Sequence, residues 1–380
     1  MEKKKQDFSG NKNFWKNKKI LVTGGASFIG SHLVDSLVSR NLDVRVVDDL
    51  SSGTLENIKH HIPNGNIDFV NGDLRETTIA KKSVRDIDLI FHLAGDHGGR
   101  GYVDLHQAGP ATNLLLDGNL FWQAYKAGVG KIVFASSGCV YPNYLQINPK
   151  QKLYLKESQV GPPFDADNMY GWAKLMSEMA LQAYTQELGL KSASCRFFTV
   201  YGPRSKEDHA ITAMIARAFI KQDPFTVWGN GRQVRNWTHV DDIVRGFILA
   251  AEKIDDGTSV NLGSEERITV LEAVKMIFDY LGYSCKIELH PEMPTGPANR
   301  VADNKLAKNL LGWEPQVKFS EGLEKTIEWY FANKDRHEVA KNLEKLLAER
   351  NQSKVTTNKN KKTNKEVNKE ENFQYLKTTE

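Results

Sequence analysis

The segment that most constrains this chain is residues 20–33, where a strongly apolar run leads through four small residues straight into a helical pattern. Small residues allow a tight turn, and the free N–H groups at the start of a helix attract an anion. This strand–turn–helix order is typical of a site for the pyrophosphate of a dinucleotide. A glycine-rich match alone is weak evidence for a dinucleotide site, so this interpretation depends on the later segments of the chain.

The later segments up to about residue 200 show a regular alternation of strands and helices. Such an alternation predicts a parallel sheet covered by helices on both faces, with ligands at the carboxyl ends of the strands. We therefore expect an α/β fold, a doubly wound parallel sheet of the Rossmann type. Further strands are predicted at 44–47, 67–70, 89–93, 131–135 and 192–197, and helices at 29–40, 113–127 and 170–188.

The alternation of strands and helices ends after residue 201. Beyond it, loops rich in Gly, Pro and polar residues separate helical patterns at 210–221, 242–253, 270–281 and 320–331. This predicts a smaller α-rich C-terminal lobe. We expect a polar extension over residues 1–18, a dinucleotide-binding domain over 19–200, and a substrate lobe over 201–333 with segments that return to the first domain. Residues 334–380 are charged and predicted to be a disordered tail, in which 335–350 could form a solvent-facing helix.

Composition excludes several classes of protein. The 380 residues carry a net charge of only +4, which gives little reason to expect nucleic-acid binding by the core. Three widely spaced cysteines rule out a disulfide framework and a C-x-x-C metal site and indicate a reducing compartment. The polar start is no secretory signal, and no apolar run reaches the roughly 18 residues of a membrane span. We expect a cytoplasmic protein with no metal site and no membrane partner.

Tyr170 and Lys174 stand four residues apart and so share one helix face. An ammonium beside a phenol is expected to lower the pKa of the phenol, which would make Tyr170 a general base for an alcohol that loses hydride to NAD. Ser137, at the end of a predicted strand, would hydrogen-bond the reacting oxygen. Asp48 ends the second strand about 20 residues after the loop, where a carboxylate binds ribose hydroxyls and disfavours the 2′-phosphate of NADP.

These motifs, together with later segments, resemble the extended short-chain dehydrogenase/reductase family that acts on nucleotide sugars, over residues 19–332. The later segments are 196–203, 228–235, 260–264, 300–303 and 311–315. The resemblance implies NAD as cofactor, a nucleotide-sugar substrate and a homodimer. It implies cofactor contacts from Gly24, Ser27, Phe28, Ile29, Gly30, Asp48, Asp73, Leu74, Leu93, Ala94, Gly95, Asn113, Tyr170 and Lys174.

The same resemblance places the substrate, with Arg235 and Arg300 on its diphosphate, since guanidinium groups match phosphate oxygens. Two residues depart from the family pattern: Ser27 replaces a glycine that faces the pyrophosphate, and Thr199 replaces an asparagine that contacts the substrate. The implied substrate contacts are Gly98, Gly99, Arg100, Ser137, Thr199, Arg235 and Arg300.

The subgroup is indicated by Cys139, two residues after Ser137, and by the double-glycine loop at residues 98–99. Both resemble the GDP-mannose 3,5-epimerases, with the GDP-fucose synthases second, in which the cysteine exchanges protons next to a 4-keto group. The matching partner acid here is His209, with Lys206 and His97 as substitutes. Alternatively, Cys139 is a small buried hydrophobe and His209 a polar residue at a helix start.

We therefore predict a nucleotide-sugar epimerase, an isomerase that forms a transient 4-keto sugar and exchanges protons at C3 or C5. A simple 4-epimerase, in which the cysteine takes no part, and a 4,6-dehydratase or reductase remain alternatives. Asp48 disfavours an NADPH-consuming synthase. A remote alternative is a non-enzymatic RNA-binding relative that uses the basic ends of the chain.

Overall fold

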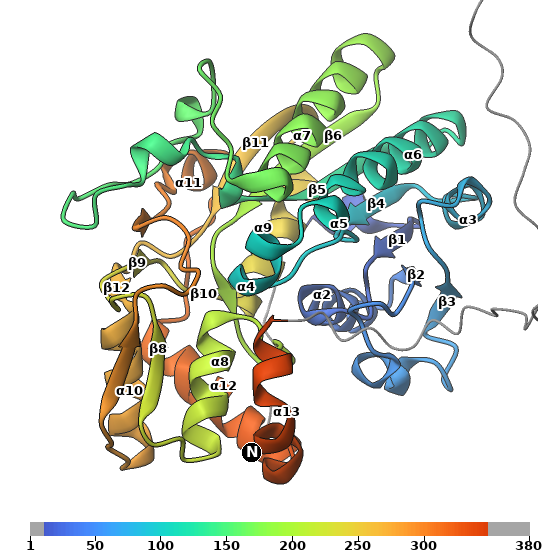
Figure 1. The fold of residues 1–380 in the computed structure, drawn as a ribbon. Helices are drawn as coiled ribbons and strands as arrows, with labels where there is room; N and C mark the ends of the chain where they lie inside the picture. The colour runs from blue at the N-terminus through green and yellow to red at the C-terminus, as the bar shows by residue number, and fades with distance from the viewer. Residues whose placement is uncertain (1–10, 349–380) are drawn as a thin grey trace, which may run out of the picture.

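The computed structural model describes residues 11–348, and its centre is a parallel seven-stranded sheet (Figure 1). The strands lie in the order β11-β6-β5-β4-β1-β2-β3. This confirms the predicted doubly wound α/β fold. The strands are β1 Lys19–Thr23, β2 Asp43–Asp48, β3 Ile67–Asn71, β4 Leu89–His92, β5 Lys131–Ser137, β6 Lys191–Phe197 and β11 Asp256–Leu262.

Helices cover both faces of the sheet, as the buried apolar strands require. On one face, α3, α6 and α7 enclose a core that includes Phe121 and Phe134. On the other, α2, α9 and α11 enclose a second core around Phe91 and Phe247. The helices of this part are α1 Lys12–Trp15, α2 Phe28–Val38, α3 Thr77–Ser83, α4 Arg100–Leu105, α5 Ala108–Ala111, α6 Asn113–Lys126, α7 Asn168–Leu188, α9 Val240–Lys253 and α11 Lys305–Leu311.

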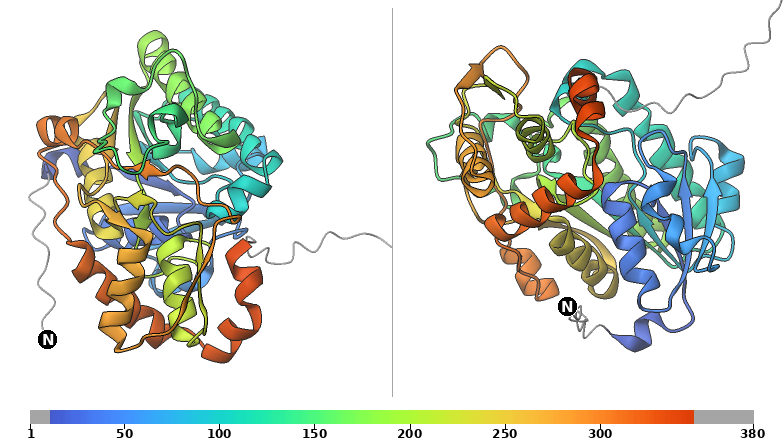
Figure 2. Two further views of the ribbon diagram at one scale, coloured as in Figure 1. Left: turned by 60° about the vertical axis from the view of Figure 1, so that its left-hand side comes forward. Right: turned by 90° about the horizontal axis from the view of Figure 1, so that it is seen from below.

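A smaller helical lobe packs beside the carboxyl ends of the strands (Figure 2). Its own core contains Phe219, Phe225, Trp237 and Tyr330, all buried. Two-residue strands form two small sheets, ordered β10-β7 and β12-β9-β14. These strands are β7 Val200–Tyr201, β9 Val234–Arg235, β10 Thr238–His239, β12 Ile268–Thr269 and β14 Asn299–Arg300. The main elements are α8 Ala210–Phe219, β8 Phe225–Trp228, α10 Val270–Leu281, β13 Ile287–His290, α12 Phe319–Asn333 and α13 Arg336–Ala348.

The order of the strands positions the site. β1 lies between β2 and β4, so the chain moves to opposite sides of the sheet after β1 and after β3. The loops that leave β1 and β4 therefore diverge at their carboxyl ends. In open parallel sheets such a switch point forms the crevice where ligands bind.

The structure corrects the prediction for the start of the charged tail. Residues 336–348 form α13, and this helix is not solvent-facing all round, because Val339, Leu343 and Leu347 are buried. These three residues recur every four positions and so form one stripe, which contacts α4 and α8. The stripe is too narrow to stand out from its charged surroundings in the sequence. The proposed RNA-binding tail lies outside the described residues.

No helix within residues 11–348 has the length and apolar character that crossing a membrane requires.

The packing of α13 predicts the effect of shortening its central apolar side chain. Leu343→Ala should lower the free energy of unfolding by about 2–4 kcal/mol, because a buried leucine is replaced by a cavity. Urea unfolding followed by tryptophan fluorescence measures this. Leu310→Ala, on α11 with 43% exposure, is the control and should cost far less. Equal effects of the two substitutions would contradict the buried position of α13.

Candidate active site

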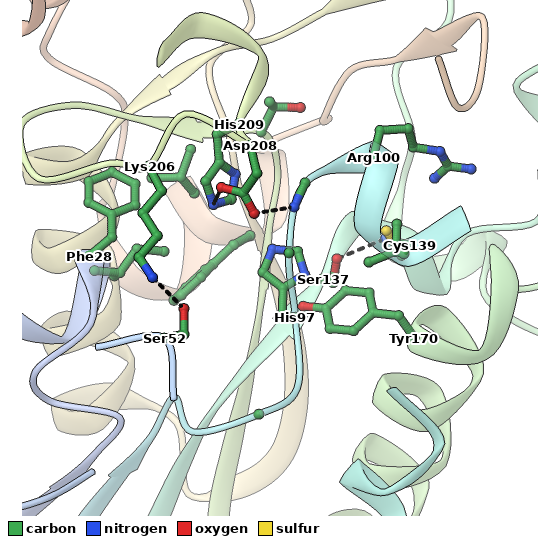
Figure 3. A pocket seen from close by; sticks show the side chains of 18 of the residues that line it. Phe28, Ser52, His97, Arg100, Ser137, Cys139, Tyr170, Lys206, Asp208 and His209 are labelled. Carbon is green, nitrogen blue, oxygen red and sulfur yellow. Dashed lines mark hydrogen bonds and ion pairs between the residues drawn. The ribbon is translucent and has the colours of Figure 1, made fainter. Parts of the chain in front are cut away.

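A cavity of about 440 Å³ lies at the switch point, between the strand ends and the helical lobe. Residues of the sheet domain and of the helical lobe line this cavity, and Figure 3 shows several of the side chains that face it. All predicted site residues line it except Gly30 and Asn113. The alternative candidates Lys206 and His97 line it as well.

The loop after β1 has the geometry that a dinucleotide needs. Gly24 has a φ of +67°, and a Cβ on Gly30 would lie only 2.1 Å from the Gly24 carbonyl oxygen. The first turn of α2 therefore packs directly on the loop and presents its unpaired N–H groups to the cavity. Ser27, which replaces a glycine, donates its hydroxyl to the Gly24 carbonyl at 2.5 Å. These residues fit a bound pyrophosphate, with the Ser27 side chain folded back onto the turn.

Asp48 closes the same end of the cavity. Its carboxylate accepts the backbone N–H groups of Ala26 at 3.0 Å and Leu50 at 2.8 Å. Burial raises the pKa of Asp48 to about 6, although these two hydrogen bonds act in the opposite direction. The carboxyl is therefore held at the cavity wall, with a pKa raised to about 6.

Two expected cofactor contacts are used inside the protein. Asp73 lines the cavity, but both of its oxygens accept from Arg75, at 3.0 and 2.9 Å from Nε. Asn113 is fully buried and does not line the cavity, so its contact with the cofactor stays a prediction. Its amide oxygen accepts the Asp96 N–H at 2.6 Å and its Nδ2 donates to the Asp96 carbonyl at 3.0 Å. Asn113 thus positions the loop after β4.

Tyr170, Ser137 and Lys174 come together where β5 meets α7, and Tyr170 shares a hydrogen bond with Ser137. Burial raises the pKa of Tyr170 well above its ordinary value, and the nearby Cys139 adds to the effect. The prediction that Lys174 lowers this pKa is wrong for the structure. The Lys174 ammonium lies 5.9 Å from the centre of the phenol ring, and burial lowers the pKa of Lys174 itself.

Cys139 lies at the cavity wall in the short helical turn after β5. Its backbone N–H donates to Ser137 Oγ at 3.1 Å, and its Sγ accepts Nη1 of Arg300 at 3.1 Å. A Cβ on Gly171 would lie 2.4 Å from the Cys139 carbonyl oxygen, so α7 approaches this turn closely. The thiol is therefore held between the phenol of Tyr170 and a guanidinium.

His209 enters the cavity from another wall, as the residue before α8 (Figure 3). Its Nε2 lies 3.8 Å from Oδ1 of Asp208, whose Oδ2 accepts the Gly99 N–H at 2.8 Å. The ring of His97 lies 5.7 Å from that of His209 and stacks on Tyr170 at 4.6 Å. Imidazole groups therefore lie next to the phenol, and Asp208 links the double-glycine loop to His209.

Buried contacts anchor the loop that carries His209. Glu207 accepts the hydroxyl of Tyr330 and the ammonium of Lys334, each at 2.8 Å, and both partners lie in or next to α12. Lys206 donates to Ser52 at 3.4 Å on the cofactor side. The loop thus connects the helical lobe with the dinucleotide end of the cavity.

The sequence interpretation missed the far wall of the cavity, which is formed by α8, β8 and α13. Arg217, Trp228 and Leu347 line this wall. One signal was present, because Arg217 interrupts the apolar run of α8. Leu347 carried no signal that could place it near Trp228.

The absence of a metal site was expected from the spacing of the cysteines. Within residues 11–348, donor atoms of Asp35, His60 and His61 lie within 4.8 Å of one another, away from the cavity. Arg204 pairs with the same Asp35 carboxylate at 2.8 Å. The histidines and the arginine thus share this carboxylate.

The raised pKa of Asp48 predicts how dinucleotide binding depends on pH. Ribose hydroxyls donate to a carboxylate, so affinity for NAD should rise with pH, by up to about tenfold per unit, and level off above pH 6. Calorimetric titration with NAD between pH 5 and 8 measures this. Asp48→Asn should remove the dependence, whereas Asp43→Asn, at the other end of β2, should leave it in place. A pH-independent affinity in the unaltered protein would contradict the role of Asp48.

Comparison with known proteins identifies the family to which this chain belongs. Residues 20–263 match the NAD dependent epimerase/dehydratase family. The chain is 31% identical over 324 residues to GDP-mannose 3,5-epimerase 1 of Oryza sativa subsp. indica, covering 83% of each chain. It matches UDP-glucose 4-epimerase of Thermotoga maritima with a TM-score of 0.73 and 31% identity over 82% of this chain and 98% of that one.

The Thermus thermophilus UDP-glucose 4-epimerase in complex with NAD matches with a TM-score of 0.73 and 27% identity, over 83% of this chain and 100% of that one. The glycine loop and Asp48 thus have the arrangement that NAD requires, in a chain similar to proteins that bind it. The chain belongs to the NAD-dependent epimerase/dehydratase family, whose cofactor is NAD.

Proposed function

We propose that this protein is a nucleotide-sugar epimerase that forms a transient 4-keto sugar and exchanges protons at C3 or C5, as a GDP-mannose 3,5-epimerase does. One observation carries the proposal: Cys139 and His209 reach the same cavity as Tyr170, from different walls (Figure 3). Inversion at C3 or C5 by proton exchange is best served by proton-transfer groups on both faces of the sugar. A simple 4-epimerase would need only Tyr170, Ser137 and Lys174.

NAD, which Gly24, Ser27 and Asp48 would help to hold, would supply the hydride acceptor and donor for carbon 4 of the sugar. Tyr170 accepts the proton of the hydroxyl on carbon 4 as the ketone forms and gives it back when the ketone is reduced, and Ser137 holds the same oxygen through a hydrogen bond. A 4-ketone makes the hydrogens on C3 and C5 acidic. Cys139 then removes one of these protons and His209 delivers one to the opposite face.

The diphosphate is proposed to lie among three arginines beside Cys139. Burial lowers the pKa of Arg235 to about 9, and the charges of Arg300 and Arg100 add to this effect. Three crowded cations favour an anion between them. Arg235 donates to the carbonyls of Val234 and Thr295 at 2.9 and 2.8 Å, so a phosphate would replace or share these contacts.

We further propose a homodimer formed through α6 and α7. These two helices pack side by side and expose a row of large apolar side chains. Exposed apolar patches of this kind mark protein interfaces. The row, here named the α6–α7 patch, consists of Leu115, Trp122, Trp172, Met176 and Met179, between 38% and 59% exposed.

A cytoplasmic location also stays part of the proposal, supported by the chain's three free cysteines.

The proton exchange can be followed in deuterated water. With GDP-mannose as the first substrate tested, product isolated after turnover should carry carbon-bound deuterium at C3 or C5, detected by NMR. Cys139→Ala and His209→Asn should each reduce this incorporation about 10²- to 10⁴-fold, because each removes a proton-transfer group. Cys195→Ala, at a buried thiol away from the cavity, is the matched control.

Other outcomes separate the candidate functions. Product without carbon-bound deuterium, together with an active Cys139→Ala variant, would identify a simple 4-epimerase. No turnover of any GDP-, UDP-, CDP- or dTDP-sugar by the NAD-loaded protein would refute the proposal as a whole.

The dimer is tested by light scattering coupled to gel filtration. The unaltered protein should elute at twice the 42.8 kDa mass of the chain. Met176→Glu places a charge in the α6–α7 patch and should give a monomer, because burying an unpaired charge is costly. Ile147→Glu, on a loop with 74% exposure, should leave the dimer intact. A monomeric unaltered protein would disprove this part of the proposal.

A further inference from the structure

One face of α8 runs along the cavity from the reactive end to the far wall. After His209, the residues of α8 that line the cavity are Ala210, Ala213, Met214 and Arg217, which follow the pattern i, i+3, i+4 and i+7 of one helix face. Arg217 follows His209 by eight positions, which is about 12 Å along the helix. Arg217 therefore lies well beyond the reacting groups, on the same wall.

Arg217 is a buried cation without a bonded partner. The residue is 5% exposed, and its guanidinium makes no hydrogen bond or ion pair with any residue from 11 to 348. Its guanidinium lies 6.0 Å from the centre of the Trp228 ring. Burial lowers the pKa of Arg217 to about 10, and the charge of Glu344 on α13 offsets this only in part. A buried charge is costly unless a partner satisfies it, which indicates a ligand with acceptor atoms.

The other residues around Arg217 favour a flat ring with apolar faces. Trp228 and Val227 of β8 and Met214 of α8 line this end of the cavity, and Leu347 of α13 adds a further apolar side chain. α13 lies against α8 and α4 (Figure 1), and a Cβ on Gly101 of α4 would be 3.1 Å from the Leu347 carbonyl. The subsite thus combines an aromatic ring, aliphatic side chains and one guanidinium.

The position of this subsite matches one part of the proposed substrate, and the inference rests on that proposed function. The dinucleotide occupies the end with the glycine loop and Asp48. The sugar lies at Tyr170 and Cys139, and the diphosphate lies among the arginines next to them. The end of the cavity between α8, β8 and α13 is then left for the base of the nucleotide sugar.

We propose that Arg217 reads the base of the nucleotide sugar and that this base is guanine. A guanidinium fork donates two parallel hydrogen bonds to the adjacent acceptors O6 and N7 of guanine. Uracil and thymine carry a donor, N3–H, between their two carbonyl oxygens, and adenine has a donor at the position of O6. Cytosine offers O2 and N3 as adjacent acceptors, but its single ring makes less contact with Trp228 and Leu347 than a purine does. The Trp228 ring and Leu347 supply apolar contacts for the purine ring.

The test measures binding and does not depend on catalysis. GDP, UDP, CDP and dTDP are titrated separately into the NAD-loaded full chain by calorimetry. GDP should bind tightest. Arg217→Met, which keeps the length of the side chain but removes its donors, should weaken GDP binding by about 10- to 100-fold and UDP binding far less. Arg217→Lys, which keeps the charge without the fork, should also lose the preference for GDP.

Arg336→Met is the matched control. Arg336 also packs over an aromatic ring, 5.1 Å from the centre of Phe219, but it lies on the exposed side of α13 and outside the cavity. It should bind GDP like the unaltered protein. Thermal melting of all variants confirms that they are folded.

The remaining outcomes separate this inference from the proposed function. Equal weakening of all four nucleotides by Arg217→Met would show a contact with the shared diphosphate and would overturn the inference. Unchanged GDP binding, or a preference for UDP in the unaltered protein, would overturn it as well and leave the epimerase proposal standing. Failure of all four nucleotides to bind would refute the proposed function itself.

Discussion

The arrangement of the cavity depends on the buried carboxylate of Asp167. It accepts two hydrogen bonds from Arg100, at 2.8 and 3.0 Å, and one from Arg300 at 3.0 Å. Burial alone would raise its pKa, but the two arginines lower the pKa of Asp167 to about 2. One ionised group thus joins the start of α7, which carries Tyr170, to the double-glycine loop and to β14. Breaking such a buried pair leaves uncompensated charge, so these segments hold together.

The chemistry proposed for the cavity follows from this connection. Arg300 donates to Asp167 and also to Cys139, so the group that orders the wall also contacts the thiol. On the opposite side, Asp208 connects the double-glycine loop to His209. Proton transfer at two faces of a sugar needs groups held at fixed positions on separate walls. The buried ion pairs of Asp167 provide that rigidity on the wall that carries Cys139.

Much of the fold was predictable because it depends on local patterns. Apolar runs alternating with helical periodicity predicted the sheet, and the small residues after β1 predicted the loop at which Gly24 and Gly30 meet. The Tyr170 and Lys174 pair was correctly placed on one helix. The pKa of Tyr170 was not correctly predicted, because the pKa of a phenol depends on burial by residues from distant segments. Asn113 was assigned to the cofactor for its family position, whereas its contacts are with the backbone of Asp96.

The sequence by itself determined the class of fold, the order of its elements and the residue types available at the strand ends. These properties follow from backbone sterics and from which side chains avoid water, and both act over a few residues. Only the tertiary structure decided that α13 closes the far wall and that Arg217 lies buried beside Trp228. Such contacts join segments far apart in the chain, and their energies depend on distances and burial that no local pattern contains.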